Sequence, residues 1–315
     1  MVDDDRTPCR IPATRRRCMI ELPYEKPEDF QKFWLETTAE AMEFPLKVSN
    51  FRVLQNLPST HEVETFSFAG VSGKVRHGWL AYPEGARSLP GFLWVPPYGR
   101  ESKLPDEYGT RTGMVSLSFN FHGEDAFHQE AYKPERGYFA EGAEDPESWI
   151  FRSMYQDAVI ALRILHAQVQ VNENQIGVAG MSQGGGMGVW LGAWMPLVKA
   201  VCAEMPFMCG MGNTVKNYAH RFPLKELADF MNEIPIGEQR IMNTISYFDT
   251  VFQAEYCSVP THVTVGLKDP SARVPNVQAM YEALAGTKHL ETIDWGHDWH
   301  PSMVMNTKRW FFQNF

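Results

Sequence analysis

The pentapeptide Gly180-Met181-Ser182-Gln183-Gly184 places a serine between two glycines. It follows an apolar run at 175–179 and precedes a segment in which Met187, Leu191 and Trp194 recur with helical spacing. A G-x-S-x-G sequence between a strand and a helix indicates a nucleophile elbow, a strained turn that exposes the serine hydroxyl at the helix N-terminus. Ser182 is therefore the candidate nucleophile. The alternative is a glycine-rich turn that contains an incidental serine.

A serine hydroxyl is a weak nucleophile, so it needs a general base that is itself oriented by an acid. In enzymes with this elbow, the acid and then the histidine follow the serine along the chain. Asp269 comes shortly after the predicted strand at 263–265, and we expect it to be the acid. The alternative is a turn aspartate before Pro270. His297 follows the last predicted strand directly and is the expected base, with His300 as its competitor.

The attack of a serine on an ester creates an oxyanion, which requires preorganised N–H donors. One expected donor is the backbone N–H of Gln183, the residue after the candidate nucleophile. The other should come from the turn after an early strand, where the sequence reads Pro96-Pro97-Tyr98-Gly99. Prolines have no N–H group, so Tyr98 is the first residue of this turn that can donate. The alternative is a tyrosine in an ordinary turn.

Other patterns give little support for a metal or a nucleotide. His297-x-x-His300 has histidine spacing that could hold a metal, but no carboxylate motif accompanies it. The chain contains neither a GxxxxGK[ST] loop nor a G-x-G-x-x-G sequence after a strand. We therefore expect no cofactor. Trp149 and Trp299 could stack on a sugar ring, although burial in the core is the more common role of such residues.

Alternating strands and helices must position these side chains. Strands are expected at 63–68, 75–82, 91–95, 114–121, 175–180, 200–205, 263–265 and 290–295. Helices are expected at 30–42, 148–169, from the elbow through 194, and at 223–232, 276–284 and 303–312. This order predicts an α/β fold with a mostly parallel central sheet and helices on both faces. We expect one such domain at 21–315, with an N-terminal helix and strand extension, after a leader at 1–20.

The composition fits this class and excludes several others. The chain has 315 residues, of which 44% are hydrophobic and 21% charged, and its net charge is -9. This acidic balance argues against nucleic-acid binding, which depends on Lys and Arg. The sequence contains no apolar run of 18 or more residues, so no membrane span is predicted. A twin-arginine export signal would need an apolar stretch after Arg15-Arg16-Arg17, and acidic residues follow instead. The five cysteines form no CxxC pair, which favours a reducing compartment, most simply the cytoplasm.

Several segments beyond the elbow are similar to the motifs of one known family. They are Pro27-Glu28-Asp29-Phe30-Gln31-Lys32-Phe33-Trp34, Arg136-Gly137, Tyr155-Gln156-Asp157-Ala158, the elbow extended through Gly185-Gly186, Pro206-Phe207-Met208-Cys209, Tyr247-Phe248-Asp249, Gly266-Leu267-Lys268-Asp269 and Gly296-His297. On these segments the chain resembles carbohydrate esterase family 7, the cephalosporin-C deacetylases and acetyl xylan esterases, over nearly its full length.

The resemblance implies an α/β-hydrolase fold and a cofactor-free cytoplasmic enzyme that removes acetyl groups from short xylo-oligosaccharides and from compounds such as cephalosporin C. It implies a homo-oligomer, a hexamer in the family. It also implies Ser182 as nucleophile, Asp269 as acid and His297 as base, with Tyr98 and Gln183 donating to the oxyanion. All five agree with the choices made from the residues alone.

The chain departs from the family pattern at three places near the expected pocket. Pro96-Pro97 stands where the family usually has His-Gly, and Asn120-Phe121-His122-Gly123 stands where it has Asp-x-Arg-Gly. Residues 271–275 replace a Cys-Pro-Pro-Ser segment. These changes bear on the preferred acyl and alcohol groups more than on the reaction class.

The sequence thus predicts a serine esterase for small acetyl esters. One alternative is another α/β-hydrolase activity, such as a peptidase or a dienelactone-type hydrolase. A second is a catalytically silent relative that serves as a scaffold.

Overall fold

The computed structural model describes residues 20–54, 60–99, 101–130, 137–218, 222–233 and 237–315. The predicted leader at 1–20 lies outside this part of the chain, apart from its last residue. Among the helices that the structure describes, none has the length and apolar content needed to cross a bilayer.

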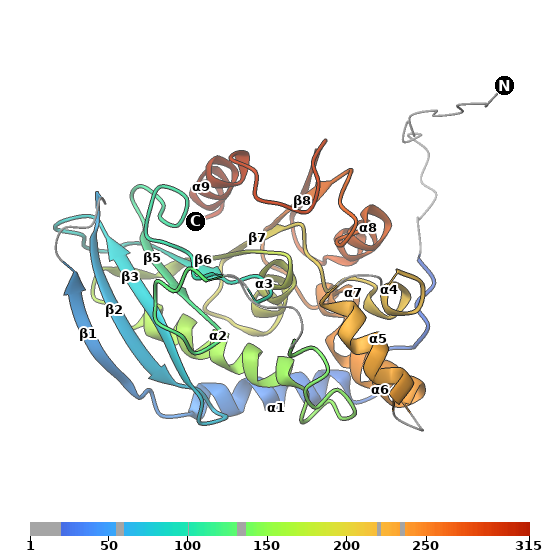
Figure 1. Cartoon of the computed structure of the whole chain (residues 1–315). Helices are drawn as coiled ribbons and strands as arrows, with labels where there is room; N and C mark the ends of the chain where they lie inside the picture. The colour runs from blue at the N-terminus through green and yellow to red at the C-terminus, as the bar shows by residue number, and fades with distance from the viewer. Residues whose placement is uncertain (1–19, 55–59, 100, 131–136, 219–221, 234–236) are drawn as a thin grey trace.

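A single mixed sheet forms the centre of the molecule (Figure 1). Its strand order within the described residues is β1-β2-β3-β5-β4-β6-β7-β8-β9. β1, β2, β3 and β5 pair antiparallel in that order, and every pairing from β5 to β9 is parallel. The strand bounds are β1 Val48–Leu54, β2 Glu62–Ala69, β3 Val75–Tyr82, β4 Leu89–Val95, β5 Val115–Phe119, β6 Val171–Met181, β7 Ala200–Glu204, β8 Thr261–Gly266 and β9 Lys288–Ile293.

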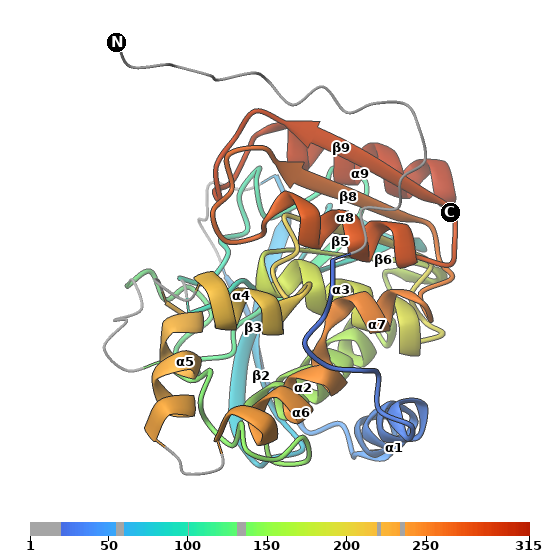
Figure 2. The ribbon, with the colours of Figure 1, turned by 90° about the vertical axis from the view of Figure 1, so that its right-hand side faces the viewer.

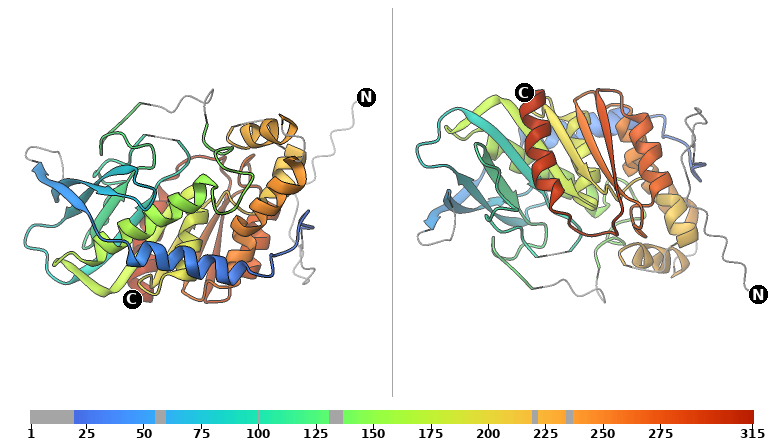
Figure 3. Two further views of the ribbon diagram at one scale, coloured as in Figure 1. Left: turned by 90° about the horizontal axis from the view of Figure 1, so that it is seen from below. Right: turned by 90° about the horizontal axis from the view of Figure 1, so that it is seen from above.

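Helices cover both faces of this sheet, as predicted. Their bounds are α1 Phe30–Glu43, α2 Ile150–His166, α3 Gln183–Trp194, α4 Met211–Tyr218, α5 Leu224–Glu233, α6 Gly237–Phe248, α7 Thr250–Ala254, α8 Val274–Ala283 and α9 Ser302–Asn314. Figure 2 shows α8 and α9 on opposite sides of β8 and β9. In Figure 3, α1 runs beside α2 in the view from below, and α9 crosses the sheet in the view from above.

Alternating side chains on β4 explain the two layers. Leu93 and Val95 join the larger core under α2 and α3, while Phe92 and Trp94 join a smaller core on the other face. Phe311 of α9 packs into that second core. Both faces of a parallel strand are apolar because both are covered by helices.

The predicted elements are all present, with end shifts of a few residues. The predicted strand at 290–295 is β9 at Lys288–Ile293, and the predicted strand at 263–265 is the longer β8. Four further elements, β1, α4, α6 and α7, were not predicted from the sequence. β1 is the edge strand of the sheet, and α6 contains the β-branched and aromatic residues of Ile245-Ser246-Tyr247-Phe248, which weaken a helical signal.

A buried ion pair joins the antiparallel part of the sheet to α2. Nε of Arg76 on β3 lies 2.7 Å from Oδ2 of Asp157 on α2, and the two side chains are 5% and 0% exposed. Arg76 also donates to the carbonyl of Phe121. Burial raises the pKa of Asp157 to about 6, although Arg76 acts in the opposite direction. Removing the guanidinium therefore leaves the buried Asp157 carboxylate without its ion-pair partner.

Replacing Arg76 with methionine should lower the free energy of unfolding by about 3 kcal/mol or more, because a buried charge loses its partner. Urea unfolding at pH 7.5 measures this. Lys32→Met is the matched control, since Lys32 lies 3.8 Å from Glu36 and both side chains are more than half exposed. It should change the free energy by less than about 0.5 kcal/mol. Equal effects of the two substitutions would contradict a structural role for the buried pair.

Candidate active site

Ser182 lies in a sharp turn between β6 and α3. Its backbone angles are φ 57° and ψ -118°, a left-handed conformation that is unfavourable for a residue with a side chain. Its N–H donates to the carbonyl of Glu204 on β7 at 2.9 Å. Its own carbonyl accepts from Gly186 and Phe207 at 3.1 and 3.0 Å. These three bonds hold the strained turn in place.

Glycines allow the turn to lie against its neighbours. A Cβ on Gly184 would meet the carbonyl oxygen of Val95 at 2.1 Å, and one on Gly180 would meet the backbone carbon of Gly184 at 2.4 Å. Both contacts are with backbone atoms, so a flexible side chain cannot relieve them. The G-x-S-x-G pattern thus reflects close packing of β4, β6 and the start of α3.

The structure brings Asp269 and His297 together with Ser182. Nε2 of His297 lies 2.8 Å from Oγ of Ser182, and Nδ1 lies 2.7 Å from Oδ2 of Asp269. The other carboxylate oxygen of Asp269 accepts from the N–H groups of Ser271 and Ala272 at 2.7 and 2.8 Å. The acid is fully buried, while the imidazole is 21% exposed. This arrangement can accept a proton from the serine hydroxyl and stabilise the resulting imidazolium.

The competing histidine lies in another environment. Nδ1 of His300 is 2.8 Å from Oγ of Ser302, and its ring packs edge-on against Trp295. His300 therefore bonds Ser302, the first residue of α9, and not Ser182. Within the part of the chain that the structure describes, no group of three metal-ligating side chains gathers around the His297-x-x-His300 segment or elsewhere.

Tyr98 and Gln183, the two expected oxyanion donors, both lie near Ser182. Tyr98 lies three residues beyond the end of β4 and lines the same cavity as Ser182. Gln183 begins α3, where first-turn N–H groups have no partner within the helix. The side chain of Gln183 is buried and accepts from Oη of Tyr138 at 2.8 Å, and that hydroxyl accepts from the N–H of Gly99 at 3.2 Å.

This tyrosine bridge was not predicted from the sequence. Tyr138 joins the turn that contains Tyr98 to the helix that begins at Gln183, so the two candidate N–H donors belong to one connected structure. The only sequence signal was the neighbouring Arg136-Gly137 motif, which says nothing about a hydroxyl bridge.

A cavity of about 800 Å³ opens in front of the serine and histidine. Its walls include the aromatic side chains of Trp94, Tyr108 and Trp299. Trp299 is therefore placed where it can touch a substrate. Trp149, the other tryptophan considered for sugar stacking, is 1% exposed and donates to the carbonyl of Phe139 in the core.

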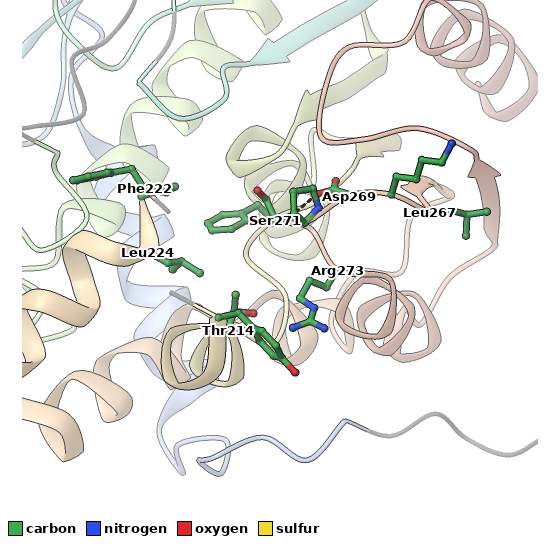
Figure 4. Close-up of a pocket in the computed structure, with 12 residues that line it drawn as sticks. Thr214, Phe222, Leu224, Leu267, Asp269, Ser271 and Arg273 are labelled. Atoms are coloured by element: carbon green, nitrogen blue, oxygen red, sulfur yellow. Dashed lines mark hydrogen bonds between the residues drawn. The ribbon is translucent and has the colours of Figure 1, made fainter. Parts of the chain in front are cut away.

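A second cavity of about 460 Å³ adjoins the first (Figure 4). The two share five lining residues, which are Phe207, Phe222, Pro223, Pro270 and Ser271. Arg273 points into the second cavity, and its guanidinium lies 3.3 Å from the ring centre of Tyr218. Asp269 is one of the residues that line this second cavity, although its carboxylate is buried.

Known proteins are similar to this chain in sequence and in fold. Residues 22–314 match the model of the family described as acetyl xylan esterase (AXE1). The acetyl esterase Axe7A of Xylanibacter ruminicola is 24% identical over 259 residues, which are 78% of this chain and 58% of that protein. The chain thus spans less than two thirds of the length of this relative.

Solved structures share the fold. An acetyl xylan esterase from Paenibacillus sp. R4 superposes with a TM-score of 0.84 at 24% identity and covers 94% of this chain and 97% of its own. Acetyl xylan esterase 1 from Thermoanaerobacterium sp. JW/SL YS485 has a TM-score of 0.80 at 21% identity, with 92% and 94% covered. An acylaminoacyl peptidase from Pyrococcus horikoshii has a TM-score of 0.57 at 16% identity, with 81% and 40% covered. The predicted α/β-hydrolase fold is confirmed.

Two glycine substitutions in α3 separate the elbow from ordinary helix packing. Gly184→Ala places a methyl group against the Val95 carbonyl and should destabilise the protein by about 2 kcal/mol or more. Gly188→Ala is the matched control, because its Cβ would meet side chains only at 3.7 Å or beyond. It should stabilise the helix by about 0.5–1 kcal/mol. Thermal unfolding of both variants measures the difference, and a stable Gly184→Ala protein would show that the elbow is not closely packed.

Proposed function

Because the chain belongs to the acetyl xylan esterase (AXE1) family, we propose that it is a serine esterase that hydrolyses small acetyl esters through an acyl-enzyme. The observation that carries this proposal is the unbroken contact from Asp269 through His297 to Ser182 at the wall of an 800 Å³ cavity. The family is described by its action on acetyl esters, and the three side chains in contact are able to perform that hydrolysis.

The first half of the reaction forms the acyl-enzyme. Oγ of Ser182 attacks the acetyl carbonyl while Nε2 of His297 takes the hydroxyl proton. Asp269 holds the imidazole with Nδ1 protonated and stabilises its positive charge. His297 then gives the proton to the leaving alcohol, and the acetyl group remains on Ser182.

The second half releases acetate. His297 accepts a proton from water, and the resulting nucleophile attacks the acetyl carbonyl. The tetrahedral intermediate collapses, the proton returns to Oγ of Ser182, and acetate leaves. No redox step or group carrier is needed.

The N–H groups of Tyr98 and Gln183 are the proposed oxyanion donors. Both residues adjoin Ser182, and the hydroxyl of Tyr138 fixes their spacing through Gly99 and the Gln183 side chain. Donors that are fixed before the reaction stabilise a developing oxyanion without rearranging, which is the main source of their catalytic effect.

The finer features of the proposal rest on relatives and composition. Acetylated xylo-oligosaccharides are the proposed substrates, since similar proteins are named acetyl xylan esterase or acetyl esterase, and cephalosporin C-like compounds follow from the family resemblance. We further propose one functional α/β domain at 21–315, a cytoplasmic site of action and a homo-oligomer.

Replacing Ser182 with alanine should reduce kcat/KM for 4-nitrophenyl acetate by about 10³-fold or more, because the nucleophile is lost. His297→Ala should cause a loss of similar size, since a triad acts as a unit. His300→Ala is the matched control and should retain activity within about threefold, because His300 bonds Ser302 rather than the serine. Undiminished activity in the Ser182 and His297 variants would indicate a different catalytic site. A wild-type protein that is as inactive as these variants would favour a scaffold role.

The length of the acyl group provides a separate test of substrate class. Among 4-nitrophenyl acetate, butyrate and octanoate, we expect the acetate to have the highest kcat/KM. A preference for octanoate would retain the esterase chemistry but reject the deacetylase assignment. Cleavage of peptide substrates in preference to all three esters would favour a peptidase.

A further inference from the structure

Lys103 is a cationic side chain in the wall of the cavity that contains Ser182 and His297. Its backbone is well anchored, because its carbonyl accepts from Nε1 of Trp79 at 2.6 Å and the neighbouring Ser102 N–H donates to the His128 carbonyl at 2.8 Å. The position of Lys103 on the cavity wall is therefore fixed by the fold.

Two tryptophans hold the ammonium group on one side. Nζ of Lys103 lies 3.9 Å from the ring centre of Trp299 and 5.2 Å from that of Trp94. Both tryptophans line the same cavity. Cation–π contacts restrict where the ammonium can lie, but they do not satisfy its N–H groups, which have no hydrogen-bond acceptor among the described residues.

The acidic residues nearby do not form an ion pair with this lysine within the described part of the chain. Asp106 accepts from the N–H groups of Tyr108 and Gly109, both at 2.9 Å. Asp298 accepts from the Trp299 N–H at 2.7 Å, and Glu101 is exposed. Arg111, a positively charged neighbour of Lys103, is buried with its guanidinium over the ring of Phe92.

Burial lowers the pKa of Lys103 to about 8, against the opposing effects of Asp106 and Glu101. The side chain is therefore mostly protonated at pH 7 and loses its charge as the pH rises through 8. A partly desolvated ammonium without a paired carboxylate favours an anionic ligand. Because Glu101, Asp106 and Asp298 also line this cavity, such a ligand must place its negative charge at Lys103 itself.

We propose that Lys103 determines specificity by binding a carboxylate on the alcohol part of the ester, so that the preferred substrates are acetyl esters of acidic alcohols, such as acetylated sugars that carry a uronic acid. This inference rests on the proposed function. An acetyl group carries no carboxylate, so the negatively charged group of the substrate must belong to the leaving alcohol. The aromatic walls beside Lys103 suit the apolar face of a sugar ring.

A matched pair of aryl acetates tests this directly. 4-Acetoxybenzoate and methyl 4-acetoxybenzoate differ in the presence of a carboxylate and have the same acetyl group. The measured quantity is the ratio of their kcat/KM values at pH 7. In Lys103→Met this ratio should shift about tenfold or more toward the neutral ester, the size expected for loss of a charge-assisted hydrogen bond.

Lys103→Arg is the matched control, because it keeps the positive charge and the stacking on tryptophan. Its ratio should stay within about threefold of wild type. Between pH 7 and 9.5 the wild-type preference for the carboxylate should decline as Lys103 loses its proton, while that of Lys103→Arg should not. This pH comparison uses only the wild type and Lys103→Arg, which both carry a positive charge at position 103 at pH 7. It therefore does not depend on whether Lys103→Met folds.

The outcomes separate the two proposals. Hydrolysis of the neutral ester that depends on Ser182, together with an unchanged ratio in Lys103→Met, would overturn the role of Lys103 and leave the esterase intact. A wild-type ratio that does not vary with pH would overturn it as well. Absence of Ser182-dependent hydrolysis of either ester would overturn the proposed function itself.

Discussion

The distance between the backbones of β4, β6 and α3 controls the rest of the site. The helix can begin directly behind Ser182 only because Gly180 and Gly184 have no side chains to meet the Val95 and Gly184 backbones. The turn is also tied to the neighbouring strand β7, because the Glu204 carbonyl accepts a hydrogen bond from the Ser182 N–H. Tyr98 follows Val95 by three residues, and Gln183 precedes Gly184. The close packing of Gly184 on the Val95 carbonyl therefore helps to place both proposed oxyanion donors.

The order of the strands brings the remaining groups to this point. Ser182, Asp269 and His297 follow β6, β8 and β9, which are parallel to one another, so their carboxyl ends lie at one edge of the sheet. The antiparallel part, β1 to β3, does not supply the proposed triad. It extends the core instead, and the buried pair of Arg76 and Asp157 ties it to α2.

Most of the successful predictions came from short sequence patterns. The elbow and the residues after two late strands give strong short-range signals, and these three side chains do meet in the structure, while their catalytic roles remain a proposal. Contacts between distant segments could not be predicted in this way. The bridge from Tyr138 to Gln183 and the position of Lys103 between Trp94 and Trp299 depend on how loops fold over the sheet. α4 and α7 were missed because they are short, with 8 and 5 residues, and periodicity needs a longer run.

The strained backbone of Ser182 has an evolutionary consequence. A residue with φ 57° and ψ -118° costs about 1–3 kcal/mol relative to a relaxed conformation, and glycine avoids most of this cost. Selection for folding alone would therefore favour glycine here, whereas the proposed role of Ser182 as nucleophile requires a hydroxyl. A relative that had lost its catalytic duty would be expected to carry glycine here and to be more stable than its active ancestor. On the proposed role of Ser182, the chain keeps a hydroxyl for its chemistry at a cost in stability.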